Sequence, residues 1–288
     1  MLVHYANALV DGLILEDCPA GDLTTDALGI GDEHGHMTFA PRADVTVAGV
    51  ELASLVLARC GCRPRALKRD GAAVAAGDAV LEADGAAFAL HRGWKVAQNV
   101  LEYMTGIATR AAAICAEASL GHEGCPVAVT RKHFPGAKPM SLAAATAGGC
   151  VVHRAGLSET ILVFDRHRAF LPRQDGESPV AALAARLPAL RRKAPERPVT
   201  AEVETLDDAV TLARAGIDAI QLDRYPIEIL AEAVAAIRRA NPATRVLAAG
   251  GISAANARLA AASGVDALVT SWPYFGRPQD MRVTMRRA

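Results

Sequence analysis

The stretch RVLAAGGISAANARLAAASGVDALVTS, residues 245–271, decides the fold class. An apolar run at 245–249 is followed by Gly250-Gly251, a segment of helical periodicity at 253–263 and a second apolar run at 267–271. A strand, a helix and a strand in this order predict two parallel strands joined by a right-handed crossover. Glycine turns of this kind are used at the phosphate-binding ends of α/β barrels. We therefore expect a barrel, since the competing doubly wound sheet lacks its Gly-x-Gly-x-x-Gly turn in this sequence.

The same alternation extends back to residue 127. Short apolar runs occupy 127–130, 160–164, 199–204 and 219–223, and helix-period segments lie at 141–149, 178–194, 206–215 and 226–240. The first third of the chain has a different texture. It predicts a helix within residues 1–30 that ends in a turn-rich segment, a strand at 36–48, a helix at 50–59, short strands within 67–90 and a linking helix or two at 94–118. The sequence therefore predicts a small α+β unit followed by an α/β unit.

Composition limits the classes of partner. The chain has 288 residues, with 31 Lys plus Arg and 31 Asp plus Glu, and this balance gives no support to a nucleic-acid or membrane-surface partner. No apolar segment is long enough to cross a bilayer without charges. The first residues carry acidic groups and no basic start, which argues against a signal peptide. The six Cys are scattered, so we interpret them as reduced thiols of a cytoplasmic protein.

Polar and charged residues follow each predicted strand of the second half. They are Arg131, Lys132, His153, Arg154, Asp165, His167, Glu202, Glu204, Asp223, Arg224, Gly250, Gly251 and Ser271. In a barrel these groups converge on one mouth. Cations come early and carboxylates late, a division that suits an anionic substrate bound together with a divalent cation. Taken singly, each residue fits a structural role, such as a solvated strand end or a plain turn; taken together, they favour a site.

An ordered series of motifs resembles the quinolinate phosphoribosyltransferase family, also called nicotinate-nucleotide pyrophosphorylase (carboxylating). The motifs are Glu16-Asp17, 21–25, Asn99 with 105–109, 130–132, Gly148-Gly149 leading to His153-Arg154, 201–204, Leu222-Asp223 and 250–252. The resemblance implies an N-terminal open-faced α+β sandwich at 1–112 and an incomplete, TIM-like α/β barrel at 113–272, with a segment at 273–288 that returns to the first domain. It also implies a homodimer or homohexamer in which a neighbouring subunit completes each site.

The resemblance further implies an activity and the residues that carry it. Family members transfer phosphoribosyl from phosphoribosyl pyrophosphate to the ring nitrogen of quinolinate with Mg²⁺, and the product loses CO₂. The implied catalytic residues are Lys132, Glu202 and Asp223: Lys132 holds the pyrophosphate, and the two carboxylates serve the ribose and, through the ligand, Mg²⁺. The implied substrate-binding residues are Lys95, Arg131, His153, Arg154, Phe164, Asp165 and His167, and the 5′-phosphate falls to Gly250, Gly251 and Ser271.

Two departures from the family pattern concern the acceptor. Lys95 stands where the family has an Arg that reaches a neighbour's site, and Phe164 stands where it has a Lys. Lys keeps the charge but not the bidentate fork, and Phe164 removes a cation that quinolinate's two carboxylates would meet. The chain is most similar to the molybdenum-transport (ModD) branch of the family. We therefore expect a small anionic, heteroaromatic acceptor, with a non-catalytic binder of a small anion or cofactor precursor as the alternative.

Overall fold

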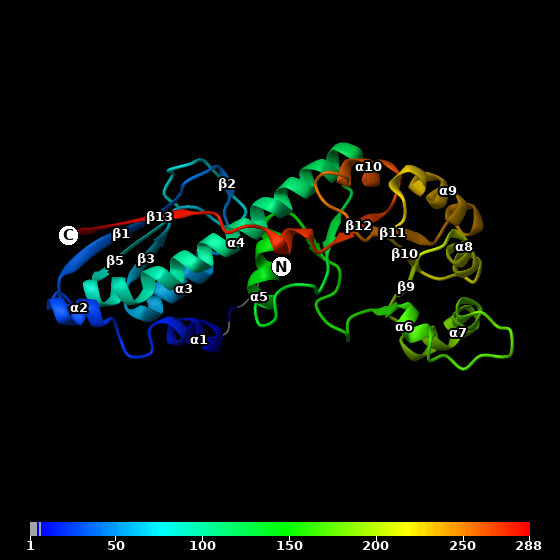
Figure 1. Ribbon diagram of the computed structural model, residues 1–288, viewed down its shortest axis with the longest axis horizontal. Coiled ribbons are helices and arrows are strands. Elements are labelled where there is room, and N and C mark those ends of the chain that lie inside the picture. The colour runs from blue at the N-terminus through cyan, green and yellow to red at the C-terminus, as the bar shows by residue number, and fades with distance from the viewer. Residues whose placement is uncertain (1–4, 6) are drawn as a thin grey trace. The chain divides into compact units, whose positions relative to one another are not determined.

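The structure is a computed structural model that describes residue 5 and residues 7–288 (Figure 1). Contacts divide the chain into two compact units. The sheet unit comprises the chain up to residue 112, residues 133–149 and residues 273–288, and the barrel unit comprises residues 113–132 and 150–272. Residues 133–149, which fall inside the expected barrel domain, cluster with the sheet unit. Among the described residues, no helix is both long and apolar enough to cross a membrane.

An antiparallel sheet of four strands organises the sheet unit. Its order is β13 (Met281–Arg287), β1 (His34–Pro41), β5 (Leu81–Ala86) and β3 (Arg63–Ala66). Alternation in β1 buries Met37 and Phe39 completely, and this face packs in one core with α3 (Val50–Cys60) and α4 (Ala87–Gly121). β2 (Val45–Thr46) and β4 (Ala73–Val74) form a separate pair. The terminal strand β13 pairs with β1 along seven residues, so the chain ends in the sheet unit.

Two helix predictions in this unit need correction. The segment predicted as one helix within 1–30 contains α1 (Asn7–Asp17) and α2 (Leu23–Leu28), because the Asp22 side chain accepts from the backbone N–H groups of Thr24 and Thr25 and starts a new helix. Residues 1–4 and 6 of that prediction lie outside the described residues. The linking helix α4 begins at Ala87 instead of 94 and runs unbroken for 35 residues.

Seven parallel strands form the barrel unit. Their order is β7 (Val151–Val152), β6 (Val127–Val129), β12 (Ala267–Thr270), β11 (Arg245–Ala249), β10 (Ala219–Asp223), β9 (Val199–Val203) and β8 (Ile161–Val163). Each pair of neighbouring strands in this sheet is parallel, and within the described residues the edge strands β7 and β8 do not pair with each other. The sheet is therefore a curled, incomplete barrel. Together with the sheet unit, it confirms the predicted fold class.

Helices connect the strands of the barrel. They are α5 (Lys138–Ala147), α6 (Asp165–Arg168), α7 (Pro179–Lys193), α8 (Leu206–Arg214), α9 (Leu230–Ala240) and α10 (Ala257–Ala262), with 3₁₀ turns at Ile227–Ile229 and Trp272–Phe275. Side-chain caps define two starts: Ser178 accepts from the Ala181 N–H before α7, and Thr205 accepts from the Asp208 N–H before α8. The helical periodicity of the second half therefore reflects genuine crossover helices.

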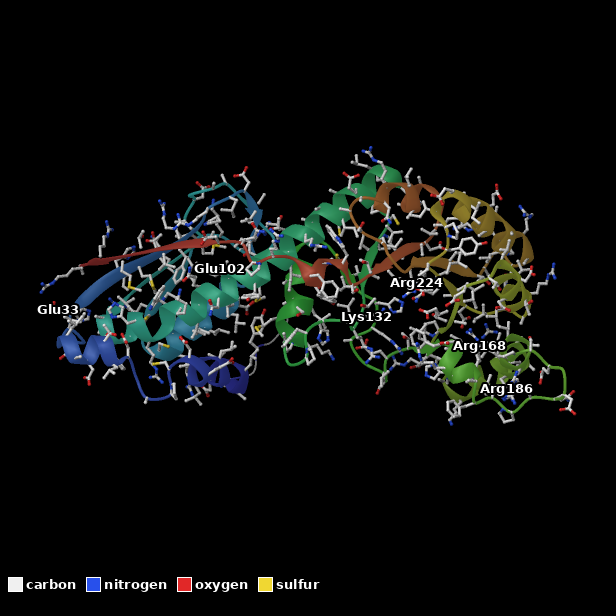
Figure 2. The ribbon with its side chains drawn as sticks, in the orientation of Figure 1. Glu33, Glu102, Lys132, Arg168, Arg186 and Arg224 are labelled. Carbon is white, nitrogen blue, oxygen red and sulfur yellow. The ribbon has the colours of Figure 1, made fainter. Side chains whose placement is uncertain are left out.

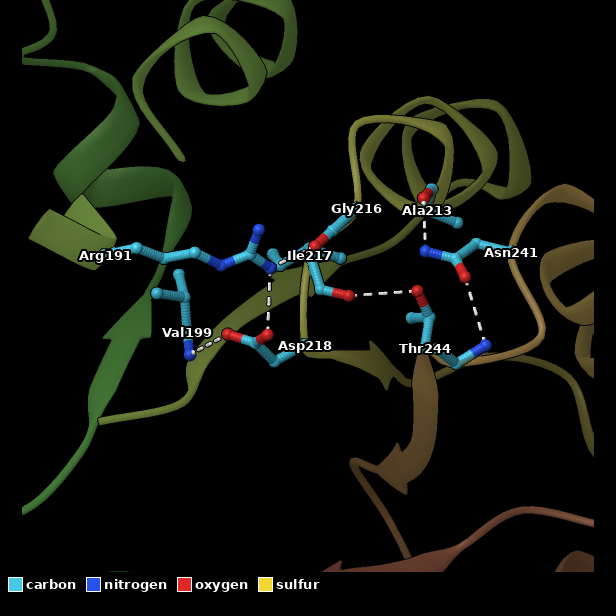
Figure 3. Close-up of polar contacts among 9 residues, drawn as sticks. Arg191, Val199, Ala213, Gly216, Ile217, Asp218, Asn241 and Thr244 are labelled. Atoms are coloured by element: carbon cyan, nitrogen blue, oxygen red, sulfur yellow. Dashed lines mark hydrogen bonds and ion pairs between the residues drawn. The ribbon is translucent and has the colours of Figure 1, made fainter. Parts of the chain in front are cut away.

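A repeated clamp fixes the amino ends of the strands (Figure 3). Asp218 accepts from the backbone N–H of Val199 at 2.8 Å and from Arg191 at 2.9 Å, and Arg191 also donates to the Gly216 carbonyl. One unit further along, Asp266 accepts from the N–H of Val246 at 2.7 Å and from Arg238 at 3.3 Å, and Arg238 donates to the Gly264 carbonyl. These clamps hold the strand starts in register, so the opposite ends of the strands are fixed as well.

Candidate active site

The predicted site residues of the second half gather at the carboxyl ends of the parallel strands. Arg131 and Lys132 follow β6, His153 and Arg154 follow β7, Phe164, Asp165 and His167 follow β8, Glu202 lies near the end of β9, Asp223 ends β10, Gly250 and Gly251 follow β11, and Ser271 follows β12. Figure 2 shows Lys132, Arg168 and Arg224 on the segments that follow β6, β8 and β10. Because all seven strands are parallel neighbours, one edge of the sheet carries every one of these segments.

Glu202 and Asp223 form the acidic part of this edge. Burial and the negative charge of Asp223 raise the pKa of the Glu202 carboxyl, while a hydrogen bond from Gln221 and the charge of Lys132 oppose the shift. The amide nitrogen of Gln221 donates to the Glu202 carboxylate at 2.6 Å. Gln221 lies two residues before Asp223 on the same face of β10, so the strand period places both beside Glu202. Gln221 was not among the predicted site residues, because a neutral side chain inside an apolar run does not stand out in the sequence.

Arg168 holds the backbone of Glu202 in place. Its side chain is 8% exposed and donates from Nη1 to the carbonyl oxygen of Glu202 at 2.7 Å. Our sequence interpretation overlooked this role, because an Arg in a short polar segment after a strand gives no sign of its direction. Arg166, two residues earlier, points to solvent and pairs with Asp165 at 3.7 Å. Arg168 is therefore a positioning residue for the carboxylate, and Arg166 is a surface residue.

The cationic part of the edge contains a buried charge without a counter-ion. Arg154 is 6% exposed, and within the described part of the chain its side chain has neither an ion pair nor a hydrogen bond. Burial and the nearby Arg131 lower the pKa of the Arg154 guanidinium. Burial and Arg154 likewise lower the pKa of His153, against the effect of Gln221. An unpaired buried cation is costly, so this arrangement favours an anionic ligand.

Phe164 and His167 form a small aromatic platform after β8. Their rings stack at 5.6 Å between centroids with an interplanar angle of 24°. The backbone N–H of Phe164 donates to Nδ1 of His167 at 3.0 Å, which places the proton of a neutral His167 on Nε2. The Arg154 guanidinium lies 5.8 Å from the centroid of the Phe164 ring. A cation therefore lies beside an apolar ring, a combination that suits an aromatic acid.

The loop at Gly250-Gly251 depends on the absence of side chains. Gly250 has φ +80°, and a Cβ there would lie 2.6 Å from the backbone nitrogen of Arg224 and 2.7 Å from Oδ1 of Asp223. Arg224 itself has φ +52°, and its N–H donates to the carbonyl of Ala249 at 2.8 Å. Gly251 has φ +73° and faces open space. The loop therefore packs closely against Asp223, and the backbone of Gly251 beside it stays accessible.

Lys95 differs from the other predicted residues in its location. It lies on α4 within the sheet unit, where its ammonium donates to Gln98 at 2.8 Å and lies 4.2 Å from the centroid of the Trp94 ring. As for metals, residues 5 and 7–288 contain no group of three or more His, Cys, Asp or Glu side chains placed to hold an ion. A metal at Glu202 and Asp223 would therefore need further oxygen ligands from a substrate and water.

The chain is similar in sequence and in fold to several known proteins. Models of the quinolinate phosphoribosyl transferase C-terminal and N-terminal domains match residues 107–283 and 22–105. A protein of Rhodobacter capsulatus named "Putative pyrophosphorylase ModD" is 43% identical over 247 residues, covering 85% of this chain and 92% of that protein. The nicotinate-nucleotide pyrophosphorylase (carboxylating) of Mycobacterium leprae is 31% identical, covering 86% of this chain and 84% of its own. The structure of NadC from Streptococcus pyogenes superimposes with a TM-score of 0.86 at 24% identity, over 98% of this chain and 96% of that one.

Proposed function

The chain belongs to the quinolinate phosphoribosyl transferase family, and from that premise we propose that it is a Mg²⁺-dependent phosphoribosyltransferase. It moves phosphoribosyl from phosphoribosyl pyrophosphate to a ring nitrogen of a small heteroaromatic acid. The observation that carries the proposal is the buried, unpaired Arg154 on the same strand edge as the carboxylates Glu202 and Asp223. A transferase of this kind needs cations for an acid and a pyrophosphate, and carboxylates for a sugar that becomes positively charged.

The reaction breaks the bond from ribose C1′ to the pyrophosphate oxygen and forms a bond from the acceptor nitrogen to C1′. Arg131, His153 and Arg154 hold the carboxylate of the acceptor, and Lys132 binds the departing pyrophosphate. Ionised Glu202, held by Gln221 and Arg168, stabilises the positive charge that develops on the ribose. Gly250, Gly251 and Ser271 receive the 5′-phosphate through accessible backbone and hydroxyl groups.

The pair Glu202 and Asp223 fits Mg²⁺ in one respect. Two carboxylates with no third protein ligand suit an ion that keeps several waters and substrate oxygens in its octahedral shell. When bound there, Mg²⁺ would supply positive charge to the leaving pyrophosphate. We also propose a homodimer or homohexamer in which Lys95 reaches a neighbour's site. Light scattering tests the assembly, and a purely monomeric protein would exclude it.

Phe164 limits which acids can serve as the acceptor. A ring acid can stack on Phe164 while Arg154 holds its carboxylate, but one cation fewer is available than a quinolinate site has. We therefore expect the native acceptor to be a heteroaromatic acid with less negative charge than quinolinate. If quinolinate is used only by Phe164→Lys, the native acceptor is a different acid. Release of CO₂ alongside pyrophosphate would instead identify a quinolinate-like acceptor.

Pyrophosphate release from phosphoribosyl pyrophosphate with Mg²⁺ and a panel of pyridine, pyrimidine and pterin acids tests the reaction. Glu202→Gln and Arg154→Ala should abolish release with the acid that works. Their matched controls are Glu232→Gln, an exposed acid in the first turn of α9, and Arg166→Ala, an exposed Arg. If calorimetry shows that phosphoribosyl pyrophosphate does not bind, the proposal fails. Binding without release for every acid would favour a non-catalytic small-anion binder.

A further inference from the structure

The barrel has a cavity of about 850 Å³ at the amino ends of its strands, and all the residues that line this cavity belong to the barrel unit. The volume lies within the range of about 300–1,000 Å³ that is typical of small-molecule sites. Strand alternation explains the space. Ala128, Ala219 and Ala267 leave room where bulkier side chains usually fill a barrel, and Val152, Leu247 and Val269 supply the rest of the apolar wall.

A ring of arginines surrounds the cavity. Arg191 and Arg192 end α7, Arg197 follows in the loop before β9, and Arg245 begins β11. The clamp to Asp218 fixes Arg191 (Figure 3). Over the described chain, the side chains of Arg192, Arg197 and Arg245 make no hydrogen bond or ion pair. With Glu196 and Asp218 as the acidic groups of the lining, the four arginines leave an excess of two positive charges.

The cavity is distinct from the candidate active site but reaches it. Its rim lies at the amino ends of the strands, whereas Lys132, Glu202 and Asp223 lie at the carboxyl ends and do not line it. His153 lines both, and Thr200, which is 8% exposed and contributes a hydroxyl to the cavity wall, lies two residues before Glu202 on the same strand. A ligand in the cavity would therefore lie toward the amino ends of the strands, with His153 and Thr200 in the wall on the side of the candidate active site.

We propose that this cavity is a second ligand site, for an organic phosphate whose apolar ring enters the alanine-lined interior while its phosphate binds Arg192, Arg197 and Arg245. Two features select this chemistry. Guanidinium groups bind phosphate with paired, charge-assisted hydrogen bonds. The interior offers apolar walls with polar groups from Thr160, Thr200 and His153, which match the edge of a heterocycle. An inorganic anion alone would leave the interior without an apolar partner.

Calorimetry with adenosine monophosphate and with inorganic phosphate tests this site, with saturating phosphoribosyl pyrophosphate and Mg²⁺ present to occupy the proposed active site. We expect adenosine monophosphate to bind and inorganic phosphate to bind more weakly. The double variant Arg192→Ala/Arg245→Ala should weaken nucleotide binding about a hundredfold, because each of the two lost charge-assisted contacts costs about a factor of ten. Arg214→Ala/Arg239→Ala removes the same charge from exposed helix ends and should bind normally.

A cavity-filling variant gives a second test. Ala267→Leu fills the interior, so it should abolish nucleotide binding while the circular dichroism spectrum confirms that the protein is folded. The inference is overturned if the parent does not bind the nucleotide, if inorganic phosphate binds equally well, or if the control double variant loses binding to the same extent. Loss of binding in Lys132→Ala, measured without phosphoribosyl pyrophosphate, would overturn it too by placing the nucleotide in the active site. None of these binding measurements requires catalytic turnover, so their outcome is distinguishable from a failure of the proposed reaction.

Discussion

Gly250→Ala tests whether the glycine loop holds Asp223 in place. The added Cβ would lie 2.6 Å from both the backbone nitrogen and Cγ of Arg224, and 2.7 Å from the Asp223 carboxylate. The Cγ atom can move, but the Arg224 nitrogen is tied to the Ala249 carbonyl by a 2.8 Å hydrogen bond. The substitution therefore adds a clash with fixed backbone to the cost of a positive φ.

The magnitude follows from the two costs. A positive φ costs a residue with a Cβ about 1 kcal/mol, and overpacking against fixed atoms costs about 2 kcal/mol more. Gly250→Ala should therefore lower the free energy of unfolding by about 3 kcal/mol in urea titrations. Because the strain is released by moving Asp223, pyrophosphate release should fall about a hundredfold, as for a catalytic group displaced by about 1 Å.

Gly124→Ala is the matched control. Gly124 has φ +76°, lies in the same barrel unit, and its added Cβ would meet nothing within 4 Å. It should lose only about 1 kcal/mol of unfolding free energy and keep full activity. If the two variants unfold within about 0.5 kcal/mol of each other, the close approach around Gly250 does not exist in solution and the reasoning fails. Normal turnover by Gly250→Ala would separately refute the role of the loop in positioning Asp223.

Three further results are expected. Arg168→Met should lower kcat about tenfold with little change in KM, because it releases the backbone of Glu202 without touching substrate; a rise in KM alone would contradict this role. Because the negative charge of Asp223 adds to burial in raising the pKa of Glu202, Asp223→Asn should shift the acidic limb of the kcat profile to lower pH, and an unmoved limb would refute the coupling. Diamide should remove two electrons and two protons from Cys115 and Cys150, whose sulfurs lie 3.6 Å apart, and mass spectrometry should then find one disulfide that Cys150→Ser cannot form.

The sequence was sufficient to predict where the barrel strands end, because the pattern that indicates a barrel is local and repetitive. Each apolar run is short, ends at a polar residue and is followed by a helix, so the carboxyl ends could be placed without knowing the strand order. Glu202 and Asp223 were predicted on these grounds. Gln221 follows from the same alternation, but as a neutral side chain inside an apolar run it carried no signal of its own.

The features that the sequence did not predict depend on the direction in which side chains point in the folded chain. Arg166 and Arg168 belong to one short polar segment, yet one faces solvent and the other is buried against the Glu202 carbonyl. Only the packing of α6 against the barrel decides between them. The hollow interior could not be predicted for a similar reason, because Ala128, Ala219 and Ala267 are ordinary strand residues until the fold places them around one cavity.

Charged side chains are therefore neutralised differently at the two ends of the barrel strands. At the amino ends, Asp218 and Asp266 neutralise Arg191 and Arg238 and satisfy the strand N–H groups, so these two charge pairs serve stability. At the carboxyl ends, Arg154 is buried without such a partner, and the nearest ring, Phe164, offers no charge. A cation that costs stability and is not neutralised by the fold must be neutralised by what the protein binds. Under the proposed function, Phe164 supplies shape and Arg154 supplies charge, so we expect the acceptor to be a flat ring with an acidic group at its edge.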